Sequence, residues 1–154
     1  MSRRVTLTPE PMTPAAFEPY GWLIDAPSRP ADRRVISPTP FDCDGASTLS
    51  VIWPPAAPRT FTRLERHFAV TQTFFQLSGT PAVVCVAAPT DVDDPQSVPD
   101  PDDVRAFVID PSKGFTFARG TWHSLDRYVA EHPGATFAIL NVDPNPTQIV
   151  DYTD

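Results

Sequence analysis

Polar and apolar residues alternate along several short segments of this chain, which is the pattern of half-buried β-strands. Residues 48–53 alternate in this way before a proline pair, and residues 82–87 form a continuous apolar run typical of a buried strand. Further strands are predicted between turn-forming residues, at 22–24, 61–67, 73–77, 104–109, 114–122 and 135–142, with a brief one near 35–36. Seven or more short strands separated by turns predict an all-β sandwich or barrel.

One short helix is expected near the N-terminus, over residues 13–21. Thr13 suits the N-cap, Pro14 suits the first helical position, and Gly21 suits the end of the helix. No internal repeat or change in composition divides the chain. Residues 1–154 are therefore predicted to form a single domain, which is long enough to bury a core.

The composition excludes several classes of protein. Twenty prolines are spread over the chain, and each proline inside a helix costs about 3 kcal/mol, so a helical bundle is excluded. The formal net charge of -7 argues against nucleic-acid binding, but a small anionic substrate needs only one arginine. No apolar run approaches the roughly 18 residues that span a bilayer, and no signal peptide is predicted, so we expect a cytoplasmic protein outside the membrane. Cys85 is expected to be a buried core thiol.

Candidate chemistry gathers around two of the chain's three histidines. Residues two apart in a strand point to the same face, so Glu65 and His67 would project together while Arg66 points away. Gln72 follows soon after, and His123 belongs to a distant strand. If the two segments face each other, these side chains form a small polar site that could perform acid–base chemistry or bind a divalent metal.

Several of these residues, and other residues of the chain, also have a purely structural explanation. A lone histidine in a strand, such as His67, is more often a structural residue than a ligand. Trp122 is expected to form a pocket wall or part of the core, and His132, in a Glu-His-Pro-Gly turn, is expected at the surface. Packing inside the barrel is the expected role of four phenylalanines: Phe74, Phe75, Phe115 and Phe117.

Two stretches resemble the sequence motifs of cupins. Residues 114–123 resemble the second cupin motif, with Gly120 and His123 in their usual places. Residues 65–67, followed by Gln72, are similar to a degenerate first motif. Within the cupins, the chain resembles bacterial ureidoglycolate lyases in five segments that occur in matching order: 17–21, 64–67, 71–74, 105–107 and 122–123.

This resemblance implies a cupin-type double-stranded jelly-roll barrel with a short N-terminal helix, usually assembled as a homodimer. It also implies a carbon–nitrogen lyase that cleaves (S)-ureidoglycolate to glyoxylate and urea in allantoin breakdown. The resemblance also implies the use of a divalent metal, for which we expect nickel or manganese in this chain, and it leaves open whether the chain needs one. No organic cofactor is expected.

Two positions depart from the family pattern. Ser124 stands where the family usually has a second histidine after the Trp-His pair, and Trp53 stands where it usually has an arginine. An arginine suits a substrate carboxylate and an imidazole suits proton transfer, so these departures leave the substrate open. The alternatives are a relative acting as a lyase, hydrolase or isomerase on another small hydroxy or oxo acid, and a cupin that binds a small molecule without catalysis.

Cleavage of ureidoglycolate needs a base, an acid and a group that holds the carboxylate. We hypothesise that His123 is the base, that Glu65 or His67 is the acid or orienting partner, and that Gln72 donates a hydrogen bond to the substrate. Arg63 shares strand parity with Glu65 and is the first candidate for the carboxylate clamp. The other candidate substrate contacts are Arg119, Phe74, Trp122, Ser124 and Trp53. In the metal-dependent version the ligands are Glu65, His67, Gln72 and His123.

Overall fold

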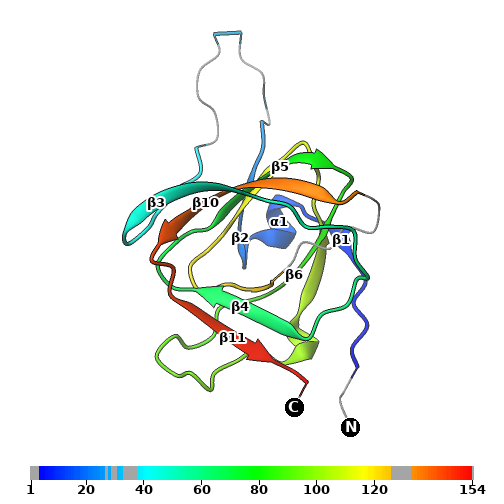
Figure 1. The fold of residues 1–154 in the computed structure, drawn as a ribbon, viewed down its shortest axis with the longest axis vertical. Coiled ribbons are helices and arrows are strands. Elements are labelled where there is room, and N and C mark those ends of the chain that lie inside the picture. Colours follow the sequence, from blue (N-terminus) through cyan, green and yellow to red (C-terminus); the bar gives the residue numbers. More distant parts are fainter. Residues whose placement is uncertain (1–3, 27, 29–30, 33–37, 126–132, 154) are drawn as a thin grey trace.

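The computed structural model describes residues 4–26, 28, 31–32, 38–125 and 133–153, and it contains two β-sheets that face each other (Figure 1). The six-stranded sheet has the order β1 (Glu10–Pro11), β7 (Arg105–Val108), β6 (Val83–Ala87), β9 (Trp122–Ser124), β4 (Arg63–His67) and β11 (Thr147–Asp151). The five-stranded sheet has the order β2 (Gly21–Ile24), β8 (Gly114–Phe117), β5 (Thr73–Gly79), β10 (Ala135–Asp143) and β3 (Ala46–Ile52). All pairs are antiparallel except β1 with β7. The prediction of an all-β fold with a short N-terminal helix is confirmed.

The segment 114–122 was predicted as one strand, and this prediction is wrong. The chain turns between β8 and β9 at Gly120, whose φ of 77° lies in the left-handed region that glycine tolerates best. Because of this turn, β8 and β9 belong to different sheets. Strands β1 and β11 were not predicted, and the expected strand at 35–36 and His132 lie outside the described residues.

The helix α1 (Pro14–Phe17) begins as predicted and ends earlier. The Thr13 hydroxyl accepts a hydrogen bond from the Ala16 amide at 3.2 Å, which caps the helix. Gly21 then starts β2, where a Cβ atom would lie 1.8 Å from the backbone oxygen of Thr116. Glycine at this position therefore allows β2 to approach β8. No helix in the described part of the chain has the length and apolar character needed to cross a membrane.

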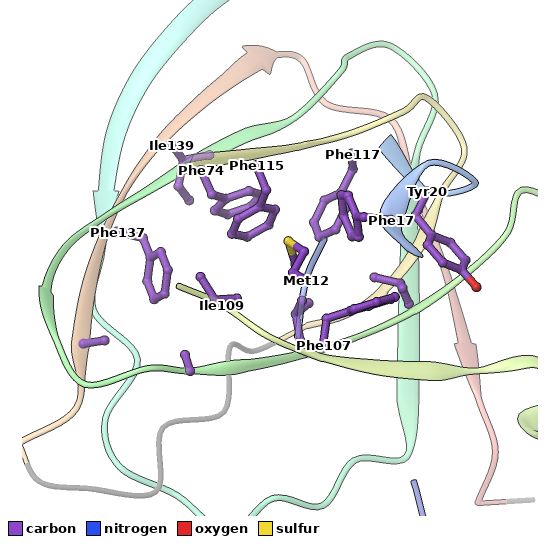
Figure 2. Close-up of a cluster of buried hydrophobic side chains, with 14 residues drawn as sticks. Met12, Phe17, Tyr20, Phe74, Phe107, Ile109, Phe115, Phe117, Phe137 and Ile139 are labelled. Atoms are coloured by element: carbon purple, nitrogen blue, oxygen red, sulfur yellow. The ribbon is translucent and has the colours of Figure 1, made fainter. Parts of the chain in front are cut away.

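Aromatic side chains fill the space between the two sheets (Figure 2). Phe74 and Phe115 stack with ring centroids 5.1 Å apart, and Phe17 of α1 meets Phe107 edge-on at 5.5 Å. Phe117 belongs to the same cluster. The predicted core role of these β-strand phenylalanines is confirmed for Phe74, Phe115 and Phe117, whereas Phe75 is half-buried on the opposite face of β5.

A second cluster lies on the outer face of the six-stranded sheet, and Arg66 is its central polar residue. As predicted, Arg66 points away from Glu65 and His67, and its side chain is fully buried. The guanidinium lies over the Trp122 ring, 4.6 Å from the ring centroid, and over Phe68 at 5.0 Å.

The Arg66 guanidinium also binds the acidic loop that follows β6. It donates to the Thr90 and Asp91 carbonyl oxygens at 3.0 and 3.1 Å, to the Thr90 hydroxyl at 3.1 Å, and to the Gln148 side-chain oxygen at 2.9 Å. Burial lowers the pKa of this guanidinium, although it stays charged near neutral pH. Arg66 therefore connects β4 and β11 to this loop.

Candidate active site

Glu65, His67 and His123 meet on the inner face of the six-stranded sheet. Strands β4 and β9 are neighbours, and Glu65 lies directly opposite His123 in their antiparallel register. Strand alternation turns His67 to the same side as Glu65, away from the Arg66 cluster. His123 is 1% exposed, His67 8% and Glu65 21%, so the two imidazoles are buried and the carboxylate is partly exposed. We call these three residues the Glu-His-His cluster.

The atoms of the Glu-His-His cluster are close enough to act together. The Glu65 Oε1 atom lies 3.8 Å from His67 Nε2 and 3.8 Å from His123 Nδ1. The two imidazole rings have centroids 5.1 Å apart. One oxygen or nitrogen atom from each residue lies within 4.8 Å of the others. These distances bring a carboxylate and two groups that can take or give a proton to one place.

Neighbouring residues hold both imidazole rings in position. Thr147 of β11 lies opposite His67 in the sheet, and its hydroxyl oxygen is 2.8 Å from His67 Nδ1. The Ser124 carbonyl oxygen is 3.1 Å from His123 Nδ1. Phe117 stacks on the His123 ring almost in parallel, with centroids 4.5 Å apart and planes inclined by 5°.

Sequence reasoning did not identify two of these neighbours as site residues. Phe117 was expected only to pack the core, and it also covers the His123 ring. Thr147 gave no sequence signal because β11 was not predicted. Reading β11 as an edge strand beside β4 would have brought Thr147 opposite His67.

Gln72 lies just before β5 and is buried. Its backbone oxygen accepts a hydrogen bond from the Phe117 amide at 2.9 Å, which ties it to the strand that covers His123. Alternation with Phe74 directs its side chain between the sheets. The Gln72 Oε1 atom is buried and has no hydrogen-bond partner among the described residues. A buried amide oxygen without a partner costs free energy, so Gln72 has an acceptor to offer a bound ligand.

Comparison with known proteins identifies the family. The family profile described as ureidoglycolate lyase matches residues 4–151, which is nearly the whole chain. The chain belongs to the ureidoglycolate lyase family. A ureidoglycolate lyase of Rhodobacter capsulatus is 33% identical over 128 residues, covering 75% of this chain and 74% of the relative. Another, from Pseudomonas savastanoi pv. phaseolicola, is 27% identical and covers 90% of this chain and 96% of the relative.

Among the arginine candidates of this ureidoglycolate lyase family member, Arg63 and Arg119 have different surroundings. Arg63 is exposed at the start of β4, on the same strand face as Glu65. Arg119 is bound by two carboxylates: its Nη2 lies 2.8 Å from Asp42, and both of its terminal nitrogens contact Asp44. The Arg119 guanidinium lowers the pKa of Asp44, and this carboxylate in turn raises the pKa of Arg119. Of the two candidates, Arg63 is therefore the one whose guanidinium is not engaged by Asp42 and Asp44.

Two further candidate substrate contacts, Trp122 and Ser124, turn away from the Glu-His-His cluster, and the expected core position of Trp122 is confirmed. Trp122 and Ser124 flank His123 in β9, so alternation turns both to the outer face of the sheet. The Trp122 indole nitrogen donates to the Thr90 hydroxyl at 3.1 Å, and the Ser124 hydroxyl accepts from the Cys85 amide at 3.2 Å. Trp53 follows the edge strand β3 and is exposed. Phe74 faces the space between the sheets, within the aromatic core.

The donor set of the Glu-His-His cluster fits a divalent cation. One carboxylate oxygen and two imidazole nitrogens suit nickel, manganese or zinc, and the Gln72 amide oxygen is a weaker further donor. Three protein ligands with an open position are the pattern of catalytic rather than structural metal sites. The residues present are thus compatible with the metal use implied by the family.

A cavity lies elsewhere, on the outer face of the six-stranded sheet. Its volume is about 800 Å³, and its lining includes Arg4, Arg59, Phe61, Cys85 and Tyr152. Among the described residues that line it there is neither a histidine nor an acidic residue. Burial raises the pKa of the Cys85 thiol to about 12, so this thiol is not a nucleophile near neutral pH. The cavity offers no acid–base pair, and the Glu-His-His cluster remains the candidate active site.

Proposed function

We propose that this protein is a ureidoglycolate lyase that releases glyoxylate and urea. The observation that carries the proposal is the buried Glu-His-His cluster, found in a chain whose family match extends over residues 4–151. Of the two positions that depart from the family pattern, Ser124 turns its side chain to the outer face of β9, and Trp53 is exposed after the end of β3. These departures therefore remove no group from the cluster, which favours ureidoglycolate over another small hydroxy or oxo acid. Such a reaction would belong to allantoin breakdown.

The reaction moves one proton and breaks one bond. Ureidoglycolate carries a hydroxyl group, a carboxylate and a ureido nitrogen on the same carbon. A base removes the hydroxyl proton, and the oxygen electrons form the carbonyl group of glyoxylate. The carbon–nitrogen bond breaks, its electron pair stays on nitrogen, and an acid protonates that nitrogen to give urea. No water is consumed, so the active site has to place an acid and a base on the two sides of one carbon.

The residues of the cluster supply these groups. We assign His123 as the base, because a neutral imidazole with an ordinary pKa of about 6.5 accepts a proton near neutral pH. His67 or Glu65 returns a proton to the departing nitrogen or orients the partner that does so. Gln72 binds the substrate through its buried amide, and Arg63, on the strand face of Glu65, binds the carboxylate.

As the metal-dependent alternative, we propose that a divalent metal, nickel or manganese, binds to Glu65, His67 and His123, with Gln72 as a weaker fourth ligand; these side chains then act as ligands in place of the acid–base roles above. When bound, such an ion polarises and orients substrate oxygens as a Lewis acid.

The assay that tests this function follows glyoxylate by NMR after addition of purified protein to ureidoglycolate. We expect release well above the spontaneous rate, loss of this activity after treatment with a chelator, and its return with nickel or manganese. Release at only the spontaneous rate, also with metal added, would contradict the lyase assignment and favour a different substrate. Full activity after metal removal, verified by elemental analysis, would instead contradict the metal and leave the acid–base version.

We also propose that the protein is a homodimer that buries the outer face of the five-stranded sheet. On the edge strand β3, Leu49 is 75% exposed and Val51 is 63% exposed. They lie beside Leu140 and Ala138 of β10. Contiguous exposed apolar side chains of this kind mark an interaction surface. A second copy suits it, since β3 also offers the unpaired backbone edge of the sheet.

Light scattering during size-exclusion chromatography tests the homodimer. We expect twice the chain mass of 16.9 kDa for the native protein and the monomer mass for Val51→Lys. Val92→Lys is the matched control, because Val92 is an exposed valine in the acidic loop and should leave the dimer intact. A monomeric native protein, or a Val51→Lys variant that stays dimeric, would contradict the proposed interface.

A further inference from the structure

The hydroxyl group of Thr147 lies between His67 and a backbone carbonyl group. Its oxygen is 2.8 Å from His67 Nδ1 and 2.9 Å from the carbonyl oxygen of Asn145, to which it donates. A hydroxyl group has one hydrogen, and a carbonyl oxygen can only accept. The Thr147 hydrogen is used by Asn145, so the Thr147 oxygen must accept a hydrogen bond from Nδ1–H of His67.

We infer that Thr147 is a positioning residue that holds neutral His67 in the tautomer with hydrogen on Nδ1. Its catalytic consequence rests on the proposed lyase function, whereas the tautomer itself does not. In this tautomer Nε2 carries the lone pair and faces Glu65 Oε1 at 3.8 Å. An acceptor nitrogen facing a carboxylate oxygen favours a proton or a cation between them. Thr147 thereby prepares Nε2 to take part in proton transfer or metal binding.

The surrounding backbone keeps Thr147 in place. Thr147 and His67 are register partners in β11 and β4, and the Phe68 amide donates to the Pro146 carbonyl oxygen at 3.3 Å. The turn before β11 is thereby held against the end of β4. The backbones of β4 and β11 therefore fix the position of the Thr147 hydroxyl group relative to the His67 ring.

His123 reaches the same tautomer in a different way. Its Nδ1 is 3.1 Å from the Ser124 carbonyl oxygen, which can only accept, so hydrogen again lies on Nδ1. A side-chain substitution leaves this carbonyl group unchanged. At His67, by contrast, the partner of Nδ1 is a side chain, and this difference makes the inference testable by mutation.

Two-bond proton–nitrogen NMR spectra of ¹⁵N-labelled histidine rings report the tautomer directly. We propose recording them at about pH 8, where an ordinary imidazole is neutral, in chelator-treated protein. Native protein and Thr147→Ser should show His67 with hydrogen on Nδ1, and Thr147→Val should show a shift toward hydrogen on Nε2. His123 should be unchanged in all three. Thr136→Val, on a strand of the other sheet, is the matched control and should resemble the native protein.

Kinetics provide the second measurement. We expect Thr147→Val to lower kcat for glyoxylate release about 10- to 100-fold, as loss of a residue that orients a ligand does, and Thr147→Ser to restore most of it. The inference is overturned if His67 carries hydrogen on Nε2 in the native protein, or if its tautomer is the same in Thr147→Val. Either result overturns it even if glyoxylate is formed. If His67 carries hydrogen on Nδ1 and its tautomer changes in Thr147→Val, but the protein has no lyase activity, the inference stands and the proposed function is refuted.

Discussion

Replacing His123 with alanine is expected to slow glyoxylate release by about 10²- to 10⁴-fold, the usual contribution of a general base. The imidazole is buried, lies opposite Glu65 and is stacked on Phe117, so its truncation leaves no group at the position assigned to the base. Steady-state kinetics on ureidoglycolate measure the effect, which should lie mainly in kcat because the base acts in the transition state.

Two further variants separate catalysis from folding in this experiment. His123→Gln fills most of the space under Phe117 and should fold, as judged by circular dichroism, while remaining inactive. His132→Ala removes the remaining histidine of the sequence, to which no role is assigned, and should keep native activity. A folded His123→Ala protein with unchanged kcat would remove His123 from the reaction and, with it, the role assigned to the cluster.

Replacing Arg66 with methionine is expected to lower the free energy of unfolding by roughly 3 kcal/mol or more, since buried hydrogen bonds to a charged group are worth about 1.5–3 kcal/mol. The substitution leaves the Thr90 and Asp91 carbonyl oxygens and the Gln148 side chain without their buried donor. It also removes the cation from the Trp122 ring. Urea unfolding followed by tryptophan fluorescence measures the loss.

Arginine geometry, and not charge alone, should account for this loss. Arg66→Lys keeps the charge but cannot direct several planar donors to both the loop and Gln148, so it should restore only part of the stability. Arg59→Met is the matched control, because Arg59 is exposed and should change the free energy of unfolding by less than about 0.5 kcal/mol. If Arg66→Met were no more destabilising than Arg59→Met, the loop would not depend on this guanidinium.

The strands that could be predicted are those with a local signal. Alternation predicted β3, the apolar run predicted β6, and the capping residues Thr13 and Pro14 marked the start of α1. Strand β11 escaped prediction because it is short, lies at a sheet edge and has exposed residues at alternate positions. The turn at Gly120 was missed because apolar residues occur on both sides of it.

The candidate substrate contacts show the limit of the same reasoning. Arg119 was a reasonable clamp in the sequence, but its charge is engaged by Asp42 and Asp44, far away along the chain. Trp122 and Ser124 adjoin His123 in sequence and for that reason point to the opposite face of the sheet. Their adjacency to His123 in the sequence suggested a shared site, whereas the alternation of side chains along a strand places them on the opposite face.

The sequence by itself determined which side chains share a face: Glu65 with His67, opposite to Arg66. This follows from the two-residue repeat of an extended chain, which is a local property. Only the tertiary structure decided that His123 lies opposite Glu65 and that Thr147, 80 residues from His67 in the chain, orients its ring. Strand order and register depend on how the whole set of strands buries its apolar faces, so no local pattern contains them.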